Sequence, residues 1–546
     1  MPVAGSRRGY HFYVDALVMR LYSVNSPLSD LKKPSTTMTT RTVGAFSKVQ
    51  LLEKTLMRAL VFLASIFACT SCSSFVFGQA NKEEKYYRIT TFETPKGEVL
   101  EAGSFQMMPS GKLAVATRRG DVWMIQDPFS ESVSAEKFSL YARGLHEPLG
   151  LAEKDGWLYA TQRSDVTRMQ DTNADGQAEK FEVVGDGWEI SGDYHEYAIG
   201  SKFDKEGNIW TVLCLTGSFG SDVPFRGWCM RVTSDGRTIP TAYGIRSPGG
   251  IGFNANGDVF YTDNQGPWNG TCGLKQLIPG KFSGHPGGNR WFKEAKEFDG
   301  KKPSSPKDNS RIMVEASKLP DLVPPSVMFP YNKMGQSASG IACDTSNGKF
   351  GPFEGQLFVG DQTHSTIMRV DMEIVSGHYQ GAVFPFRSGF QSGIVGVEMA
   401  SRGSLFVGGT NRGWGSRGPK EFAVERLDWT GIVPLEIKNM RLTSNGFRLT
   451  FTLPVDPEQA SKAENYTMDT FTYIYRSEYG SPEVDAAQAK VKKAIVSEDG
   501  LSVELVIDGL KEGHVHELHA KNISTKDQMP LLHPEAYYTL NYFPEK

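Results

Sequence analysis

Short apolar strands recur in the middle of the chain, each in the same setting. A small or apolar stretch leads into a glycine-containing turn, and an apolar strand ending in small or polar residues follows. The six copies are MMPSGKLAVATRRG, LAEKDGWLYATQRS, SKFDKEGNIWTVLC, GFNANGDVFYTDNQ, FGPFEGQLFVGDQT and MASRGSLFVGGTNR. Their turn glycines are Gly111, Gly156, Gly207, Gly257, Gly355 and Gly403, spaced by 45, 51, 50, 98 and 48 residues. A repeat of about 50 residues is typical of a four-stranded propeller blade, so we predict an all-β, six-bladed β-propeller over residues 88–430.

The doubled spacing between Gly257 and Gly355 leaves room for a seventh blade. However, residues 281–325 are rich in Lys, Pro and Gly, as in KEAKEFDGKKPSSPKDNSR, and lack the strand pattern. We therefore predict an insertion at about 281–330 within a six-bladed propeller. A tandem of β-sandwiches is the alternative, although sandwiches do not repeat a turn at this interval.

The pattern changes near residue 430. The stretches GFRLTFTLPVD and LSVELVIDGL alternate apolar and polar residues with period two, and YTLNYF lies close to the C-terminus. This predicts a separate Ig-like β-sandwich over residues 434–546. Its HVHELH stretch lacks the HExxH zinc spacing, and strand alternation places His514 and His516 on one face and His519 on the other. We read this domain as a spacer or docking module.

The N-terminal region predicts export. Residues 57–80, MRALVFLASIFACTSCSSFVFGQA, have a positive start, a short apolar core and small residues at a cleavage point, as in a signal peptide. Residues 1–56 then form a disordered or mis-assigned extension, and the protein is periplasmic or secreted. An uncleaved membrane anchor is the alternative, although the apolar run is short for a span. A lipobox-like stretch ending at Cys69 leaves a lipoprotein, and hence a lipid anchor in the membrane, open.

Charge and cysteine content narrow the choice of partner and compartment. The net charge is −3 and the sequence pI is about 6.4, so no basic field favours nucleic acid. Two of the six cysteines lie in the predicted signal peptide. The other four are Cys214, Cys229, Cys272 and Cys343, which allow three pairings. We favour a bridge between Cys214 and Cys229 across a hairpin over buried free thiols.

The stretch DTNADGQAEKFE at 171–182 fits a calcium-loop pattern, D-x-[DN]-x-[DN]-G-x₅-E. Its candidate ligands are Asp171, Asn173, Asp175, Gln177 and Glu182. Short oxygen side chains at alternate positions can converge on one hard cation, and Gly176 permits the sharp turn. The flanking residues look like strands, whereas an EF-hand needs helices. Either the loop binds a structural calcium ion, or its residues are turn formers at a hairpin tip.

Four stretches resemble the glucose/sorbosone dehydrogenase family, soluble six-bladed propellers that use pyrroloquinoline quinone (PQQ) with calcium. They are ATRRGDVWMI, LAEKDGWLYATQRSDVTRMQDTNADGQAEKF, YHEYAIGSKFDKEGNIWTVL and GIRSPGGIGFNANGDVFYTDNQG. The resemblance covers about residues 90–430. The C-terminal stretches YGSPEVD, VHELHA and PLLHPEAYYTLN resemble the terminal domain of secreted, planctomycete-type members, which often carry an Ig-like domain.

The resemblance implies catalytic roles for two residues. His195 matches the family histidine that takes the proton from the sugar hydroxyl during hydride transfer, a task that suits an imidazole near neutral pH. Arg246, in GIRSPGG, matches the arginine that contacts cofactor and substrate. The structural alternatives are a hydrogen-bonded histidine between aromatic residues and an arginine that braces a turn. His364, in GDQTHSTIMRV, is read as a loop histidine.

Cofactor residues follow from the same resemblance. The turn at Pro248 and Gly249 falls near the family's cofactor-calcium site, where backbone carbonyls bind the metal. Arg119 matches an arginine of the first blade, with a salt bridge as its alternative role. Arg412 is a candidate by blade position only, because the family's later lysine and paired arginines do not align here.

Three functions follow from these observations. The first is a quinoprotein-like oxidoreductase that oxidises sugars or related alcohols with PQQ and calcium, and passes electrons to a separate cytochrome. The second is a non-catalytic, calcium-stabilised propeller that binds carbohydrate or protein, because the scaffold does not require the cofactor. The third is a lactonase-type hydrolase in which a calcium ion in the channel activates water.

Overall fold

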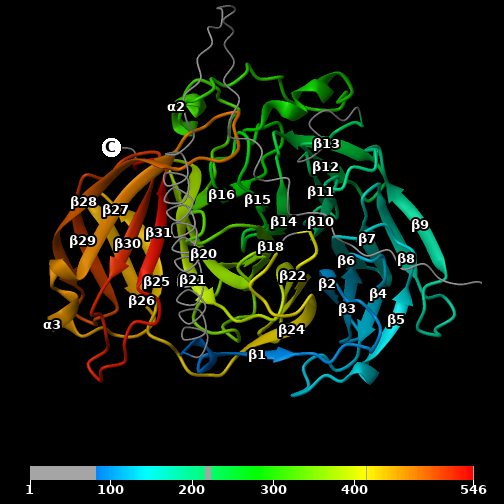
Figure 1. The fold of residues 1–546 in the computed structure, drawn as a ribbon, viewed down its shortest axis with the longest axis horizontal. Helices are drawn as coiled ribbons and strands as arrows, with labels where there is room; N and C mark the ends of the chain where they lie inside the picture. Colours follow the sequence, from blue (N-terminus) through cyan, green and yellow to red (C-terminus); the bar gives the residue numbers. More distant parts are fainter. Residues whose placement is uncertain (1–81, 216–222, 414, 545–546) are drawn as a thin grey trace, which may run out of the picture. The chain divides into compact units, whose positions relative to one another are not determined.

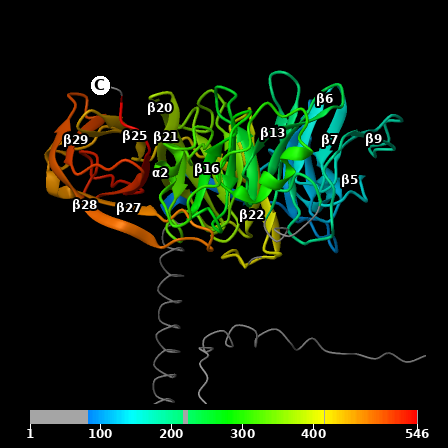
Figure 2. The same ribbon diagram turned by 90° about the horizontal axis from the view of Figure 1, so that it is seen from above.

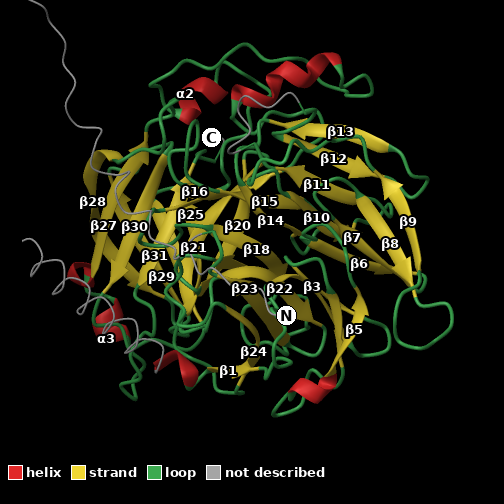
Figure 3. Cartoon of the chain, turned by 45° about the vertical axis from the view of Figure 1, so that its right-hand side comes forward, coloured by secondary structure: helices red, strands yellow, loops and turns green. Residues whose placement is uncertain are grey.

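The computed structural model describes residues 82–544, apart from residues 216–222 and 414. The described chain is mostly β-strand (Figure 1), and its helices are short (Figure 3). It forms five four-stranded sheets and one eleven-stranded sheet within these residues. None of the helices in this part has the length and apolar character of a membrane span. The extension predicted at 1–56 and the signal peptide predicted at 57–80 lie outside the described residues.

Four of the sheets are each built from four strands that follow one another in the chain. Their strands are β2 (Ala102–Met107), β3 (Leu113–Thr117), β4 (Val122–Ile125) and β5 (Phe138–Ala142); β6 (Gly150–Lys154), β7 (Trp157–Thr161), β8 (Val166–Gln170) and β9 (Lys180–Gly185); β10 (Ala198–Phe203), β11 (Ile209–Leu213), β12 (Trp228–Val232) and β13 (Thr238–Tyr243); β14 (Pro248–Phe253), β15 (Val259–Asp263), β16 (Cys272–Gln276) and β17 (Val327–Phe329). The predicted insertion carries η3 (Pro286–Lys293) and α2 (Ile312–Ala316), and β17 lies at its end.

The fifth four-stranded sheet joins distant parts of the chain. It contains β22 (Ile394–Ala400), β23 (Ser404–Thr410) and β24 (Phe422–Trp429), and its edge strand is β1 (Tyr87–Thr91). β1 pairs antiparallel with β24 over five residues, from Tyr87 opposite Trp429 to Thr91 opposite Glu425. The first strand of the described chain therefore completes the sheet that the chain forms more than 300 residues later.

The sixth set of strands differs from the prediction. It consists of β18 (Ala338–Cys343), β19 (Leu357–Asp361), β20 (Thr366–Val375) and β21 (His378–Arg387), which pair in the same order as the other sets. However, β21 also pairs with β31 (Glu535–Leu540), so the set is one end of the eleven-stranded sheet. The described residues thus show five free-standing four-stranded sheets where six blades were predicted.

The repeated glycines of the sequence occupy equivalent turns. Each lies between the first and second strands of its set and has a positive φ, between 79° and 90°. L-residues with a side chain rarely adopt this conformation, which explains why glycine recurs there. The second strands other than β7 are buried along their whole length, as in LAVAT of β3 and SLFVGGT of β23, because they are covered on both faces.

The first strands of the six sets contact one another in a closed ring, in the order β2, β6, β10, β14, β18, β22. Each carries a glycine at its point of closest approach. We call these residues the glycine ring: Gly103, Gly150, Gly200, Gly250, Gly340 and Gly396. A Cβ atom on Gly250 would lie 2.4 Å from the Ser339 oxygen, and one on Gly340 would lie 2.7 Å from the Val395 oxygen. These positions require glycine because the backbone of the next set is already in contact.

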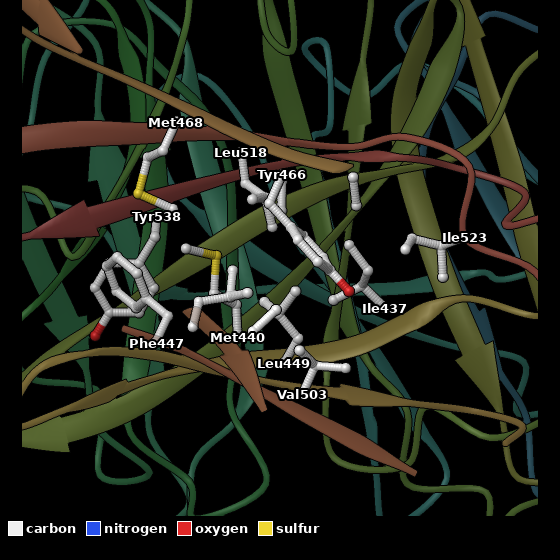
Figure 4. Close-up of a cluster of buried hydrophobic side chains, with 14 of the residues drawn as sticks. Ile437, Met440, Phe447, Leu449, Tyr466, Met468, Val503, Leu518, Ile523 and Tyr538 are labelled. Atoms are coloured by element: carbon white, nitrogen blue, oxygen red, sulfur yellow. The ribbon is translucent and has the colours of Figure 1, made fainter. Parts of the chain in front are cut away.

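The C-terminal strands build on β21 rather than standing apart. They are β25 (Ile437–Thr443), β26 (Gly446–Phe451), β27 (Tyr466–Tyr473), β28 (Glu483–Val496), β29 (Ser502–Asp508), β30 (His514–Ala520) and β31. Their apolar core includes Leu449, Tyr466 and Val503 (Figure 4), and Ala382 and Phe384 of β21 belong to the same core. Figures 1 and 2 both show β20 and β21 beside these strands. The Ig-like topology stays a prediction, whereas the sheet is continuous with the preceding strands.

The predicted disulfide between Cys214 and Cys229 is wrong. No disulfide joins any two of the four cysteines among the described residues. Strand register explains the error, because Cys229 of β12 lies opposite Val212 of β11, two residues before Cys214. The Cys214 thiol instead lies 3.8 Å from the Arg246 carbonyl oxygen.

A buried histidine links the first described residues to the C-terminal strands. His533 contacts the Glu436 carboxylate at 2.6 Å through Nδ1 and the Glu83 carboxylate at 3.0 Å through Nε2. Burial alone would lower the pKa of His533, but the two carboxylates raise it to about 10. The imidazolium is therefore charged and paired at neutral pH.

We expect Gly340→Ala to destabilise the protein by about 2 kcal/mol or more, because its Cβ would press on the Val395 carbonyl. Gly415→Ala is the control, since a Cβ there meets nothing within 4 Å, and it should cost less than about 0.5 kcal/mol. Urea unfolding measures both. Equal stability of the two variants would contradict the packing role of the glycine ring.

We expect the stabilisation from His533 to depend on pH. The folded pKa, about 10, lies above the unfolded value near 6.5, so the stabilisation is complete below about pH 6.5 and is lost as the pH rises toward 10. His533→Gln leaves the buried carboxylates of Glu83 and Glu436 without their cationic partner. Its free energy of unfolding should therefore be lower than that of wild type by about 3 kcal/mol at about pH 6. The difference from wild type should shrink by about pH 9.5. A difference that is constant across this range in urea unfolding would contradict the assignment.

Candidate functional site

Most of the predicted site residues lie at one end of the sheets. Because neighbouring strands are antiparallel, the start of each first strand and the end of each second strand lie at the same end. His195 and Arg246 precede the first strands β10 and β14, whereas Arg119 and Arg412 follow the second strands β3 and β23. We call this end the entry face; it is formed by loops 117–121, 161–165, 193–197, 244–247, 264–271, 361–365 and 410–412.

His195 lies at the entry face between two tyrosines. Its ring is edge-on to Tyr194 at 5.0 Å and to Tyr197 at 6.3 Å between ring centroids. The backbone N–H of His195 donates to the Asp193 carboxylate at 2.8 Å, which holds the turn. The side chain is 29% exposed, so a ligand can reach it.

Burial lowers the pKa of His195 below its usual 6.5, and the positive charges of Arg246 and Arg163 lower it further, against the opposing charge of Asp193. The imidazole is therefore neutral at pH 7 and can accept a proton. The loops that carry His195 and Arg246 both contact the residues that follow β11: Cys214 N–H donates to the Tyr197 carbonyl at 2.9 Å, and Leu215 N–H donates to the Arg246 carbonyl at 3.0 Å. Both residues therefore lie in the same part of the entry face.

Arg246 is buried and braces a turn. Its Nη1 donates to the carbonyl oxygens of Asn264, at 3.2 Å, and Gln265. Its guanidinium carbon lies 5.2 Å from the centre of the Tyr479 ring, a cation–π distance. Arg246 therefore braces the turn, as the structural alternative predicted, and it also lies at the entry face with His195.

A buried ion pair between Asp263 and Lys275 holds the turn that carries Arg246. The sequence analysis missed this pair. Asp263, at the end of β15, accepts from the Ser247 backbone N–H at 2.8 Å and from Lys275 Nζ at 2.9 Å. Burial would raise the pKa of Asp263, but Lys275 and the other donors hold it below its usual value. The carboxylate is therefore ionised and fixes the loop that carries Arg246. Nothing local in TDNQ or GLKQ signals this pairing.

A second ionic cluster surrounds Glu147, which precedes β6. Its carboxylate binds Arg118 at 2.9 Å, Arg163 at 2.9 Å and Arg412 at 3.0 Å. The Tyr197 ring stacks near two of these guanidiniums, with its centroid 5.3 Å from Arg118 and 5.1 Å from Arg163. Because the three arginines come from three sheets, one carboxylate ties these sheets together. Glu147 was also missed, since its partners are up to 265 residues away.

Arg119 and Arg412, predicted to bind the cofactor, share the Glu101 carboxylate. Each places Nε 2.9 Å from Glu101 Oε2. The alternative of a salt bridge for Arg119 is therefore what the structure shows. Their side chains stay partly exposed, at 52% for Arg119 and 30% for Arg412, so both remain reachable by a ligand.

The entry face carries both signs of charge. Its arginines are at 118, 119, 163, 246 and 412, and its loops also contain Asp121, Asp165, Asp193, Glu196 and Asp361. Four of the five arginines already pair with Glu101 or Glu147. Guanidinium groups also pair with carboxylate-bearing molecules such as a quinone with acid substituents. Such a molecule would compete with Glu101 for Arg119 and Arg412.

Pro248 and Gly249, predicted to lie near a cofactor-bound metal, are the first residues of β14. A Cβ on Gly249 would lie 1.9 Å from the Ala338 carbonyl oxygen, so this glycine permits contact with β18. Gly249 also lines a cavity of about 480 Å³ between the six first strands. That cavity continues to Lys202 and Glu398, which form a 3.0 Å ion pair. His195, Arg246 and Arg412 are not among its lining residues.

His364, which the sequence analysis read as a loop histidine, is also at the entry face but buried. Its backbone N–H donates to Asp361 at 2.7 Å, and burial lowers the pKa of its imidazole. It therefore resembles a structural loop histidine more than a ligand-facing one.

The loop at 171–182 joins β8 and β9 and lies at the end opposite to the entry face. Asp171 accepts from the N–H groups of Ala174 at 2.7 Å and Gly176 at 2.8 Å. Asn173 and Asp175 also accept from backbone N–H groups two residues ahead. This is the hydrogen bonding of a hairpin tip built from turn formers.

The remaining predicted calcium ligands do not join these oxygens. Glu182 lies in β9 and pairs with Arg168 and with Lys180, the latter at 3.0 Å. Gln177 donates its backbone N–H to Asp175 at 2.9 Å. No group of three or more His, Cys, Asp or Glu residues suited to a metal ion is found in the described part of the chain. The geometry favours the hairpin alternative over the calcium loop.

A family model described as a domain of unknown function (DUF7133) matches residues 99–382, more than half of the chain. No curated protein matches the sequence. The fold is similar to that of several solved structures. One is a putative oxidoreductase (glucose dehydrogenase) from Thermus thermophilus, at 19% identity and a TM-score of 0.46, covering 62% of this chain and 99% of that one.

Two further structures show a similar likeness. A PQQ-bound aldose sugar dehydrogenase from Streptomyces coelicolor is 15% identical with a TM-score of 0.44, over 63% of this chain and 98% of that one. A gluconolactonase from Xanthomonas campestris is 13% identical with a TM-score of 0.37, over 63% of this chain and 90% of that one. At these values the likeness says nothing about the substrate or cofactor of this chain.

We expect Asp171→Ala to lower stability by about 1 kcal/mol, because two backbone N–H groups of the hairpin tip lose their acceptor. The loss should be the same with calcium and with a chelator, since the carboxylate acts on the backbone. Thermal unfolding in both conditions measures this, with wild type as the reference. A chelator effect on wild type that Asp171→Ala abolishes would instead restore the calcium site.

Proposed function

The chain belongs to the family described as a domain of unknown function (DUF7133), and we propose that it oxidises sugars or related alcohols at the entry face. With β18–β21 counted as the sixth blade, the first strands surround the axis of a six-bladed propeller, and the entry face is the mouth of that axis. His195 is the proton acceptor, and its burial, with the positive charges of Arg246 and Arg163, keeps its imidazole neutral.

One observation carries this proposal: a partly exposed histidine and a buried arginine lie at the same entry face, in loops that both bond to the backbone of residues 214 and 215. A substrate hydroxyl that donates to His195 can lose its proton to the imidazole while its carbon loses a hydride. The positive charges of Arg246 and Arg163 disfavour the imidazolium before substrate binds. They also stabilise negative charge that develops on the substrate oxygen.

The hydride needs an acceptor, and the resemblance implies PQQ with calcium. A bound quinone would accept the hydride as a two-electron oxidant whose carbonyls the metal polarises. Arg119 and Arg412 are the residues of this chain that would hold its carboxylates, by exchanging them for Glu101. Electron transfer to a separate cytochrome belongs to the same proposal and rests on the family resemblance. Export by a signal peptide and a lipid anchor also belong to it and rest on the sequence alone.

Two other functions use the same face without this chemistry. A non-catalytic propeller would bind carbohydrate or protein there and show no turnover. A lactonase would hydrolyse a sugar lactone with an activated water. An oxidase reduces a dye while it oxidises a sugar, a lactonase hydrolyses a lactone, and a binding protein does neither. Assays of dye reduction, lactone hydrolysis and sugar binding therefore separate the three functions.

We expect the protein reconstituted with PQQ and calcium to oxidise aldoses with an artificial dye as electron acceptor. We expect kcat/KM of His195→Ala to fall about 100-fold or more, because a general base usually contributes a rate factor of this size. His378→Ala is the control, because His378 is an exposed histidine of β21, outside the entry face. In wild type, kcat/KM should be constant above about pH 6.5 and fall below the lowered pKa of His195, where the imidazole becomes protonated.

Three results would contradict the oxidase. Full activity in His195→Ala would remove the proposed base. Sugar binding without dye reduction would favour the non-catalytic propeller. Hydrolysis of gluconolactone by a protein that reduces no dye would favour the lactonase.

A further inference from the structure

The loop at residues 474–482, which joins β27 to β28, reaches the entry face from the C-terminal strands. It lies against the loop at 264–271, whose carbonyls hold Arg246. Three backbone hydrogen bonds join the two loops: Trp268 N–H to Arg476 O at 2.6 Å, Gly480 N–H to Gly266 O at 3.1 Å and Ser481 N–H to Gly270 O at 3.0 Å. The C-terminal strands therefore contribute directly to the surroundings of Arg246.

The 474–482 loop is also fixed internally. The Ile474 N–H donates to Ser481 Oγ at 2.8 Å, and Arg476 Nε donates to the Gly480 carbonyl at 2.9 Å. The Tyr475 ring packs edge-on to Trp268 at 5.0 Å between centroids, and its hydroxyl donates to the Gly284 carbonyl. A backbone held at so many points keeps its conformation when the Tyr479 side chain changes.

Tyr479 is the exposed residue of this fixed loop. It is 62% exposed, and its ring centre lies 5.2 Å from the Arg246 guanidinium carbon. Tyr194, 43% exposed, has its ring 5.0 Å from that of His195. The proposed base and the Arg246 guanidinium are thus each in contact with an accessible aromatic ring.

We propose that Tyr479 is a substrate-positioning residue that stacks on the ring of a sugar, so that the C-terminal strands complete the site. This inference rests on the proposed function and names its substrate class: a neutral sugar in ring form. A sugar ring presents flat C–H surface that packs on an aromatic face, while its hydroxyls stay available to His195 and Arg246. An open-chain alditol with the same hydroxyls has no such flat surface.

A rigid aromatic ring suits this task because ordering it costs little entropy. Tyrosine has two side-chain torsions, and Arg246 already restricts the ring of Tyr479. A single exposed tyrosine is common on protein surfaces and needs no explanation by itself. What distinguishes Tyr479 is its contact with a buried guanidinium that also lowers the pKa of His195.

Calorimetric titration of the full-length protein with D-glucose, cellobiose and D-glucitol tests this proposal. We expect Tyr479→Ala to weaken binding of D-glucose and cellobiose about tenfold, and Tyr479→Phe to stay within about twofold of wild type, because the stacking surface remains. D-glucitol should bind weakly to all three proteins. Phe181→Ala is the control, since Phe181 is another exposed aromatic residue, 43% exposed, on β9 and away from the entry face.

The outcomes separate this inference from the function on which it rests. Unchanged sugar binding in Tyr479→Ala, with activity that still depends on His195, would overturn the stacking role and leave the oxidase in place. Tight binding of D-glucitol would overturn the ring-form substrate class. Absence of binding of any of the three ligands by wild type would overturn both proposals. Thermal unfolding of Tyr479→Ala within about 2 °C of wild type shows that a loss of binding is local.

Discussion

Close backbone contact between the first strands is the constraint on which the rest of the structure depends. Each first strand has a member of the glycine ring where a Cβ atom would lie under 3 Å from a neighbouring set or, for Gly103, from Leu149 just before the neighbouring strand β6. Because these strands meet so closely, their starting points also come together. The loops that precede them therefore converge on one face, although they are separated by about fifty residues or more along the chain.

Ion pairs then hold the side chains of these converging loops in place. Glu147 binds three arginines from three sheets, and Asp263 with Lys275 holds the turn before β14. Buried ions of this kind add little net stability, because desolvation opposes their attraction, but each is costly to leave unpaired. Their effect is to restrict the loops to one arrangement. That arrangement leaves His195 neutral and accessible beside Arg246, while most other charged side chains nearby are already paired.

The C-terminal strands are part of the same structural unit. β31 extends the sheet beyond β21, the two parts share a hydrophobic core, and His533 joins Glu436 to Glu83. This attachment gives the 474–482 loop a fixed place beside Arg246. The sequence analysis read these strands as a spacer or docking module, and a role as spacer or docking module stays a prediction. The position of Tyr479 follows from the way in which the two parts are joined.

The sequence by itself determined the repeat and the all-β class. These follow from local patterns, since a turn glycine with positive φ and an apolar strand are properties of neighbouring residues. Only the tertiary structure decided the partners: Glu147 for its arginines, Glu101 for Arg119 and Arg412, and Tyr479 for Arg246. The structure also showed that Cys229 lies opposite Val212 and not opposite Cys214. In the loop at 171–175, it showed that the side-chain oxygens accept hydrogen bonds from backbone N–H groups of the same loop. Some of these pairings join residues that are far apart in the chain, and others depend on which hydrogen-bond donor is nearest. The periodicity of the sequence contains neither kind of information.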